Sequence, residues 1–208
     1  LDDIFDINQI RCSESALEEV KRLDSVSLSN SIEEETYDIF LINIRSFFKH
    51  ELDVLSDLHA KKSRYICLTE TWINPMEEGS PLERNNKYIY HASVGRGNGS
   101  CILAPEEKEN FHLFSTENFQ ITSLFDMNLQ MTVIYISHGT DLTLVVNALK
   151  DLMDPGIPQI VMGDFNFDSK ESNSLQIFME EKKMFQIVNE PTHIAGRCLD
   201  HIYISDVL

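Results

Sequence analysis

Short apolar runs followed directly by polar residues recur along the chain. Residues 39–42 and 65–68 are two such runs, and the segment 47–58 between them has leucines at helical spacing. Continuous apolar runs of this length are typical of buried strands, whereas apolar residues three or four positions apart are typical of a helix face. The order strand, helix, strand predicts a layered α/β or α+β sheet protein. The buried face of the helix is expected to consist of Leu52, Leu55 and Leu58.

The middle of the chain alternates short apolar segments with turn residues, which predicts strands that form an antiparallel meander. A glycine-rich turn at 95–99 joins two of them. It resembles a phosphate-binding loop only superficially, because no helix and no Lys-Ser or Lys-Thr pair follows it. We favour a plain hairpin over a nucleotide cradle. The expected strands are residues 87–92, 100–104, 111–114, 119–125 and 131–136.

Helical spacing returns in the second half of the chain. Residues 141–152 carry a broad apolar stripe that Pro155-Gly156 ends. A further helix is expected over 172–183, with Leu175, Phe178 and Met179 facing inward. The remaining short strands are expected at 159–163, 185–188 and 199–205.

The first 36 residues are polar and acidic. A short helix is expected from Ser13 to Leu23, followed by a serine-rich linker. We therefore expect residues 1–36 to form a weakly packed arm, and residues 37–208 to form one domain with enough chain for a sizeable core. The chain begins with leucine rather than methionine, which suggests a fragment or a processed product.

The formal net charge of −17 over 208 residues argues against a protein that coats nucleic acid with a basic surface. It leaves open a protein that meets nucleic acid through a bound cation and a few local lysines and arginines. The four cysteines are scattered, without a C-x-x-C pair, which favours a reducing intracellular setting. No apolar run reaches the length of a membrane span and no signal peptide is present, so we expect no membrane association.

Acids and amides follow three of the predicted strands, and another acid begins the last strand. These residues are Asn43, Glu70, Asp164 with Asn166, and Asp200. In α/β-type sheets, ligands bind at strand ends, where side chains from separate segments converge. Carboxylate and amide oxygens suit Mg²⁺ or Mn²⁺, and no His/Cys cluster indicates zinc. The residues alone therefore predict a metal-assisted phosphoester site.

The stretch from Gln159 to Asn166 is central to this prediction. Gly163 is interpreted as a breaker that lets the chain turn as it leaves the sheet. In an extended segment, Asp164 and Asn166 would point to the same side and Phe165 would point into the protein. The alternative is an ordinary Asx-rich turn after a strand.

Five motifs in a fixed order carry a more specific resemblance. They are Asn43-x-Arg45, Thr69-Glu70-Thr71-Trp72, Tyr135, Gly163-Asp164-Phe165-Asn166 and Leu199-Asp200-His201. Together they resemble the endonuclease/exonuclease/phosphatase superfamily, which includes abasic-site endonucleases and deoxyribonuclease I. The sequence around these motifs is similar to that of the endonuclease domains of non-LTR retrotransposons. It is more similar still to the endonuclease domain that some Helitron-type transposons carry behind their helicase. The match covers residues 37–205.

The resemblance implies a four-layer sandwich, in which two mixed β-sheets pack face to face with helices outside, as in deoxyribonuclease I. It also implies residue roles. Glu70 would be the main ligand of Mg²⁺ or Mn²⁺, with Asn43 beside it. Asp164 would orient or deprotonate the attacking water or assist the leaving oxygen, and Asn166 and Tyr135 would hydrogen-bond the scissile phosphate. Clustered acids without a cation should have raised pKa values.

Asp200 would, by the same resemblance, orient a catalytic histidine on one further strand with the motif Ser-Asp-His. The sequence ends before such a motif, and His201 would point to the face opposite Asp200. We therefore expect the sandwich to lack its last strand and cleavage to be severely weakened. Arg45 and Arg197 would contact substrate DNA.

Each of these residues also has a simpler interpretation. Glu70 could be a solvated acid, Tyr135 a core residue, and Arg45 the partner of a neighbouring acid. Trp72 is expected to pack rather than stack on a base. His193 and Arg197 are more simply surface residues than substrate ligands.

The sequence is therefore compatible with three functions. The leading one is a Mg²⁺-dependent, DNA-nicking endonuclease domain of a transposable element, intracellular and nuclear, fused to a helicase or a reverse transcriptase in the parent protein. DNA binding by so acidic a chain should be weak and salt-sensitive. The alternatives are a phosphatase for small phosphoesters and a catalytically dead remnant that acts at most as a binding module.

Overall fold

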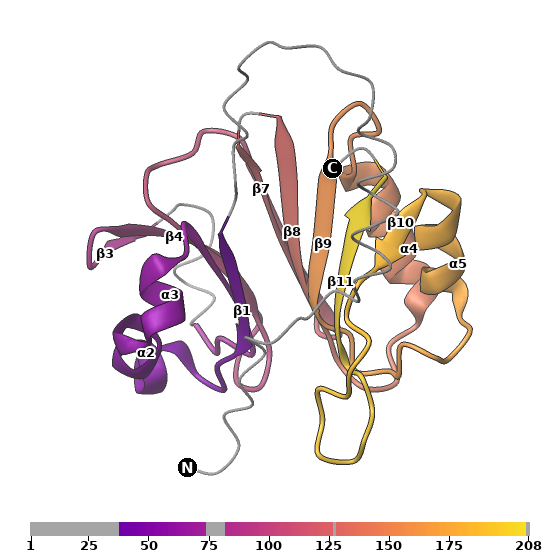
Figure 1. Ribbon diagram of the computed structural model, residues 1–208, viewed down its shortest axis with the longest axis horizontal. Coiled ribbons are helices and arrows are strands. Elements are labelled where there is room, and N and C mark those ends of the chain that lie inside the picture. The colour runs from indigo at the N-terminus through magenta and orange to yellow at the C-terminus, as the bar shows by residue number, and fades with distance from the viewer. Residues whose placement is uncertain (1–37, 74–81, 127, 207–208) are drawn as a thin grey trace, which may run out of the picture.

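Two β-sheets pack face to face, and helices cover their outer faces (Figure 1). This computed structural model describes residues 38–73, 82–126 and 128–206. The expected arm at 1–36 and its candidate helix lie outside the described residues. The predicted four-layer sandwich of two mixed sheets is confirmed.

The first sheet has five strands in the order β1-β2-β5-β4-β3. Its first two strands run parallel, and every other neighbouring pair is antiparallel. This arrangement makes β1 an edge strand and places the end of β1 beside the end of β2. The strands are β1 (Ile39–Asn43), β2 (Tyr65–Thr69), β3 (Leu82–Arg84), β4 (Lys87–Ala92) and β5 (Ser100–Ala104).

The second sheet has six strands in the order β10-β11-β9-β8-β7-β6. Only β8 and β9 are parallel. The last strand, β11, runs antiparallel to β9, so β11 begins where β9 ends. The strands are β6 (Phe111–Ser115), β7 (Phe119–Asp126), β8 (Leu129–Ile136), β9 (Gln159–Asp164), β10 (Met184–Gln186) and β11 (Asp200–Ser205).

Four described helices form the outer layers: α2 (Phe47–Ser56) and α3 (Leu58–Lys62) on the first sheet, and α4 (Leu142–Leu152) and α5 (Ser174–Glu181) on the second (Figure 1). Three begin at a side-chain cap, because Asp57, Asp141 and Asn173 accept hydrogen bonds from backbone N–H groups of the first helical turn. No helix in the described part of the chain is long and apolar enough to cross a membrane.

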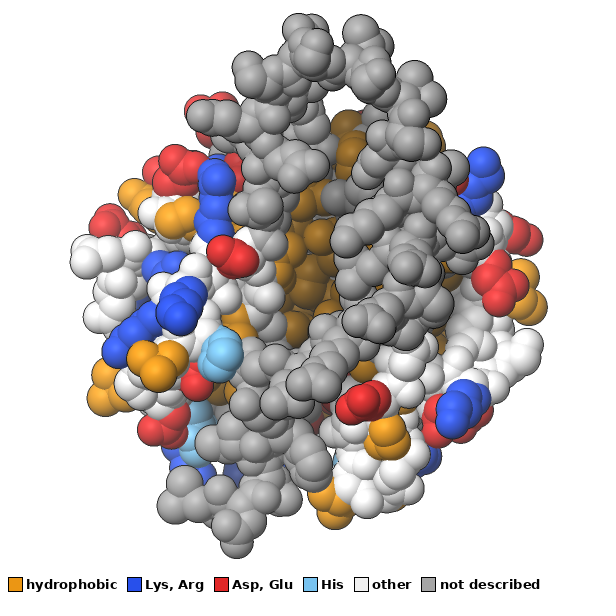
Figure 2. Space-filling model, viewed as in Figure 1, with side chains coloured by type: hydrophobic (Ala, Val, Ile, Leu, Met, Phe, Trp, Pro, Cys, Tyr) orange, Lys and Arg blue, Asp and Glu red, His pale blue; other side chains and the backbone are white. Residues whose placement is uncertain are grey.

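The core consists of three apolar layers. The middle layer lies between the sheets and includes Leu41, Tyr65 and Met162; Figure 2 shows apolar side chains in this region and charged ones over the outer layers. The other two layers join each sheet to its helices. Strands such as β8 are therefore buried on both faces, which explains their uninterrupted apolar sequences.

The expected single meander is wrong. Strands β4 and β5 belong to the first sheet, whereas β6, β7 and β8 belong to the second. The chain crosses between the sheets in the segment 105–110, which contains Pro105 and a run of charged residues. Because turn residues mark only where a strand ends, they do not indicate which sheet the next strand joins.

The expected buried face of the first helix is wrong for two of its three leucines, whereas Leu55 is partly buried and packs against the core. Leu52 is 77% exposed and Leu58 is 70% exposed. The face that packs on the sheet includes Phe47, Glu51 and Val54 instead. The spacing of apolar residues does not predict the burial of Glu51, because that burial depends on contacts with the β3–β4 hairpin. Strand β3 was not predicted from the sequence.

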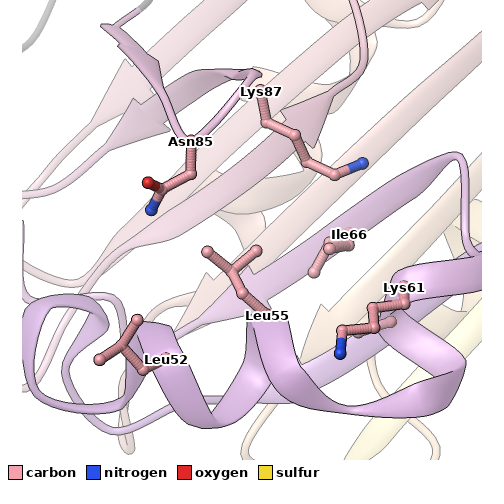
Figure 3. Close-up of a pocket in the computed structure, with 7 residues that line it drawn as sticks. Leu52, Leu55, Lys61, Ile66, Asn85 and Lys87 are labelled. Carbon is pink, nitrogen blue, oxygen red and sulfur yellow. The ribbon is translucent and has the colours of Figure 1, made fainter.

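That hairpin satisfies the buried carboxylate. Arg84 forms an ion pair with Glu51 at 2.8 Å, and the side-chain amide of Asn85 donates to it at 2.9 Å. On the same side of the sheet, Leu52 and Leu55 line a shallow hollow of about 400 Å³ whose polar residues are Lys61, Asn85 and Lys87 (Figure 3). No carboxylate, histidine or cysteine lines the hollow, so it lacks the side chains that usually bind a metal ion.

Candidate active site

The polar strand ends meet at one rim of the sandwich. Asn43 is the last residue of β1, Glu70 follows β2, and Asp164 is the last residue of β9. Asp200 begins β11 and pairs with Asp164 in the sheet. Parallel pairing places the ends of β1 and β2 together in the first sheet and those of β8 and β9 together in the second. A side-chain contact between Asn43 and Asp164 shows that these strand ends meet at one edge of the sandwich.

Backbone hydrogen bonds continue between the loops that follow β1 and β2. The N–H of Ile44 donates to the carbonyl of Thr69 at 3.0 Å, that of Ser46 to Glu70 at 2.8 Å, and that of Phe47 to Thr71 at 2.7 Å. The two loops therefore hold the side chains of Asn43 and Glu70 next to each other.

One side-chain amide joins two carboxylates. Asn43 Nδ2 donates to Glu70 Oε1 at 2.7 Å and to Asp164 Oδ2 at 3.1 Å. Glu70 belongs to the first sheet and Asp164 to the second, so this amide connects the sheets at the rim. The expected convergence of the three residues is present in the structure.

Burial and neighbouring acids alter the acidity of this cluster. Asp164 is only 6% exposed. Burial, with the Asp200 and Glu70 carboxylates nearby, raises the pKa of Asp164 to about 8, although hydrogen bonds from Asn166 and Asn43 oppose the change. Burial and Glu70 also raise the pKa of Asp200, against the effects of Thr192 and His193. Raised pKa values are what clustered acids show where no cation neutralises them.

The donor set fits a small, hard cation. Glu70 and Asp164 present carboxylate oxygens around Asn43, and the buried Asp164 lacks a positively charged partner among the residues described. No group of three His, Cys, Asp or Glu side chains in the described ranges could hold a metal ion by itself. Mg²⁺ needs no such group, because it commonly takes one or two carboxylates and keeps several waters.

Tyr135 and Asn166 complete the rim. Tyr135, next to the end of β8, pairs with Asp164 in the sheet. Burial, followed by the Glu70 and Asp164 charges, raises the pKa of Tyr135 to about 12, while hydrogen bonds involving Ser137 and Asn166 act in the opposite direction. The Tyr135 hydroxyl is therefore protonated near neutral pH and available as a donor.

The expected geometry of the Asp164–Asn166 stretch needs correction. Phe165 does point into the core, but Asn166 has a φ of 54° and is not extended. Its backbone N–H donates to Asp164 Oδ1 at 3.0 Å, and its side chain donates to the Ile136 carbonyl at 2.8 Å. The segment is thus an Asx-type turn that also places both polar residues at the rim.

Gly163 does not have the expected role of a turn residue. It lies inside β9, with a φ of 143°, between Ile134 of β8 and His201 of β11. A Cβ atom there would lie 1.9 Å from the Ile134 carbonyl oxygen. Glycine is required because the backbones of β8 and β9 approach closely just before Asp164.

Left-handed backbone conformations gather at this rim. Five of the eight described non-glycine residues with positive φ are Arg45, Ser46, Glu70, Trp72 and Asn166. Such conformations cost free energy and persist where the surroundings impose them, often at functional sites. Here they turn each loop sharply away from its strand.

The two arginines expected to bind substrate lie on loops beside the cluster. Arg45 is exposed, and its backbone N–H donates to Asn43 Oδ1 at 3.3 Å. Arg197 is exposed on the loop before β11, where its carbonyl accepts from Thr192 and His193. Neither guanidinium contacts the acids, so the structure places both near the rim but does not join them to the cluster.

His201 points away from Asp200, as expected. It is buried and stacks on Phe165 with ring centroids 4.6 Å apart, and its Nε2 lies 3.1 Å from the Phe167 carbonyl and 3.0 Å from that of Cys198. Burial lowers the pKa of His201. It is a neutral core residue.

The way in which the loop before β11 supports Asp200 was not predicted from the sequence. Thr192 Oγ1 accepts from the backbone N–H groups of Leu199 and Asp200, each at 3.0 Å. This fixes the loop against the start of β11 and brings His193 close enough to lower the pKa of Asp200. No local sequence signal indicates these contacts, because they join residues that are separated along an irregular loop.

Comparison with known proteins supports the fold. No protein-family model and no curated protein matches the sequence. The endonuclease domain of TRAS1, a telomere-specific non-LTR retrotransposon, matches with a TM-score of 0.58 at 12% identity, over 81% of this chain and 84% of that one. An AP endonuclease from Archaeoglobus fulgidus matches with a TM-score of 0.59 at 13% identity, over 82% and 87%.

A third similar structure is the 3′ phosphatase NExo from Neisseria bound to a product DNA hairpin. It matches with a TM-score of 0.59 at 11% identity, over 81% of this chain and 86% of that one. At these identities the likeness is one of fold. The chain therefore has the two-sheet, deoxyribonuclease I-like fold that these nucleases and this phosphatase share.

Proposed function

We propose that this chain hydrolyses phosphodiester bonds in DNA with the help of Mg²⁺ or Mn²⁺, as a nicking endonuclease domain. The observation that carries the proposal is the contact of Asn43 with both Glu70 and Asp164 at the rim. The three similar structures include an endonuclease domain, an AP endonuclease and a phosphatase bound to DNA, which supports the same class of reaction.

Glu70 and Asn43 would hold the cation. When bound, the ion would neutralise charge that develops on the non-bridging oxygens of the phosphate. Tyr135, protonated near neutral pH, and the Asn166 amide would donate hydrogen bonds to the same oxygens. Asp164, whose raised pKa lies near 8, would orient the attacking water and accept its proton, because a base with a pKa near the operating pH is most effective.

Asp200 would orient an imidazole beside the reacting phosphate. Within the described residues no histidine is hydrogen-bonded to Asp200, and His201 faces the core. His193 is near enough to influence the Asp200 carboxylate through space. We therefore expect turnover by this chain to be slow.

The biological setting is a further part of the proposal. The motif order is similar to that of transposon endonuclease domains, and one similar structure is such a domain. We propose that the chain nicks DNA for a mobile element, in the nucleus, as part of a protein that also carries a helicase or a reverse transcriptase. The genomic sequence on either side of the coding region would decide between these two partners.

The test is a nicking assay on supercoiled plasmid with Mg²⁺ or Mn²⁺. We expect slow, metal-dependent nicking by the unaltered chain and none by Glu70→Ala or Asp164→Ala. Equal nicking by all three proteins would mean that the activity comes from a contaminant. A parallel panel of small phosphomonoesters separates the nuclease from a small-substrate phosphatase, and the absence of all hydrolysis would favour a catalytically dead remnant.

A further inference from the structure

The arginines of this protein fall into two groups. Within the described residues, Arg64 forms ion pairs with Glu106 and Asp126, and Arg84 forms one with Glu51. The other three described arginines have no carboxylate of a described residue within 4 Å; they are Arg45, Arg96 and Arg197. Acidic residues outnumber Lys and Arg by 34 to 17 in the sequence, so this lack of partners does not reflect a shortage of acids.

These three arginines lie on loops at the rim that carries Glu70 and Asp164. Arg45 follows Asn43 by two residues and Arg197 precedes Asp200 by three. Arg96 comes from the glycine-rich turn between β4 and β5, for which the sequence predicts a plain hairpin. The two strands do pair as a hairpin, and the turn between them places the exposed Arg96 at the rim.

The turn is fastened to the segment that follows Glu70. The Trp72 N–H donates to the Asn98 carbonyl at 3.0 Å, and Ser137 Oγ lies 3.4 Å from Asn98 Oδ1. Gly99 has a φ of 119°, and a Cβ atom there would lie 2.2 Å from Thr71 Oγ1. The close fit of glycine against Thr71 lets the turn reach across to Trp72.

Arg96 is exposed, and its side chain lies against an aromatic ring. Its guanidinium carbon lies 5.3 Å from the centre of the Trp72 ring, within the range of a cation–π contact. The ring restricts the side chain without consuming its N–H donors, and a planar guanidinium presents those donors in the geometry that matches a phosphate. A side chain ordered before binding loses less conformational entropy on binding.

We infer that Arg96, held against Trp72, binds a backbone phosphate of the DNA strand on one side of the phosphate that reacts at Glu70 and Asp164. This inference rests on the proposed function and adds a substrate requirement to it. A small phosphoester has no second phosphate to reach Arg96, whereas a polynucleotide does. The site therefore favours DNA strands over small phosphoesters. The contact of Arg96 with phosphate would act against the negative net charge of the chain, which opposes DNA binding.

The experiment compares Arg96→Ala with Lys150→Ala, which removes the same charge from an exposed residue near the end of α4. Binding of a fluorescein-labelled DNA duplex is measured by anisotropy in EDTA over a range of NaCl concentrations. Hydrolysis of bis(p-nitrophenyl) phosphate, a diester with a single phosphate, is measured with Mg²⁺. Thermal denaturation checks that both variants fold.

We expect Arg96→Ala to weaken duplex binding about tenfold and to lower the slope of log affinity against log salt by about one. Hydrolysis of the small diester should be unchanged, and Trp72→Leu should weaken duplex binding less than Arg96→Ala does. Lys150→Ala should match the unaltered chain. Equal affinity and slope for Arg96→Ala and Lys150→Ala would overturn the inference, as would undetectable duplex binding by the unaltered chain.

These outcomes are separable from failure of the proposed function. If the unaltered chain hydrolyses neither plasmid nor the small diester, the hydrolase proposal fails, while the binding data still test Arg96. If hydrolysis occurs but Arg96→Ala leaves duplex binding intact, only the inference about Arg96 fails.

Discussion

The side-chain amide of Asn43 donates to the carboxylate of Asp164 across 3.1 Å, although the two residues lie 121 positions apart in the sequence. Asn43 ends an edge strand of the first sheet, and Asp164 ends an inner strand of the second. The contact therefore depends on how the two sheets are packed against each other. Any chemistry at this rim requires the sandwich to be intact.

Replacement of Asn43 tests this contact. Asn43→Ala removes the group between Glu70 and Asp164, so both carboxylates become less well oriented toward a cation. We expect the Mg²⁺ concentration needed for half-maximal plasmid nicking to rise about 10- to 100-fold. Asn147→Ala, an exposed position on α4, is the matched control and should behave like the unaltered chain. An unchanged Mg²⁺ dependence in Asn43→Ala would count against a role for the amide.

Acidity gives a second prediction. The pKa of Asp164 is raised to about 8 in the folded chain, whereas it should be about 4 when the chain is unfolded. The folded state therefore binds this proton more tightly, so the resulting stability is fully present below about pH 4 and is lost as the pH rises through about 8. In EDTA, the free energy of unfolding should decrease as the pH rises from about 4 to about 8. The decrease should be smaller for Asp164→Asn than for the unaltered chain.

Urea denaturation at a series of pH values measures the free energy of unfolding of the unaltered chain and of Asp164→Asn. Added Mg²⁺ should restore stability to the unaltered chain at high pH, because a bound cation favours the ionised carboxylate. Parallel pH profiles for the unaltered chain and Asp164→Asn would show that Asp164 is not the group responsible.

Gly163 gives a steric prediction. In Gly163→Ala the new Cβ would lie 1.9 Å from the Ile134 carbonyl oxygen, so β8 and β9 would have to separate. We expect a loss of stability of at least about 3 kcal/mol, from overpacking and the unfavourable φ together, with loss of nicking. Gly139→Ala also has a positive φ, of 77°, but meets no atom within 4 Å. It should cost only about 1 kcal/mol in thermal or urea denaturation, and an equal cost for both variants would rule out the steric account.

Asp126 gives a prediction for the end of the fold away from the site. It lies 2.6 Å from Lys108 Nζ and 3.3 Å from Arg64 Nη2, and it accepts from the Tyr65 hydroxyl. Burial works to raise the pKa of Asp126, but hydrogen bonds from Lys108 and Tyr65 outweigh it, so the pKa is lowered. Its contribution to stability is therefore present above about pH 4 and is lost as the pH falls through the lowered value.

Asp126→Ala should destabilise the chain by about 3 kcal/mol at neutral pH, because it leaves Lys108 largely buried without its main partner. It should also reduce the sensitivity of unfolding to acid. Glu106→Ala removes the exposed acid of the same cluster and should have a much smaller effect. Equal effects of the two substitutions in urea denaturation would contradict the assigned roles.

Much of the fold could be predicted from the apolar pattern. The run 65–68 is buried on both faces, and the partly buried run 39–42 packs against core layers on both faces, so both sequences are uninterrupted and their positions are clear. The polar residues after these runs also indicated the rim, because strand direction alone brings Asn43 and Glu70 together. The resemblance added Tyr135, which periodicity does not distinguish from a core residue, and it gave Asp200 a role.

Other features depend on contacts that no local pattern encodes. The buried face of α2 includes Glu51, whose burial requires Arg84 and Asn85 from a hairpin more than 30 residues away. The role of Gly163 depends on the distance between β8 and β9. The pairing of Arg96 with Trp72 depends on where the glycine-rich turn is fastened. Each is decided by packing between segments, so a sequence taken one segment at a time does not reveal it.

Calorimetric titration of Mn²⁺ into the unaltered chain and into Glu70→Ala tests the central claim most directly. If Asn43, Glu70 and Asp164 form the place where a divalent ion binds, the unaltered chain should bind one Mn²⁺ and release a proton near pH 7, and Glu70→Ala should bind none. Absence of binding by the unaltered chain, or identical binding by both proteins, would contradict the account.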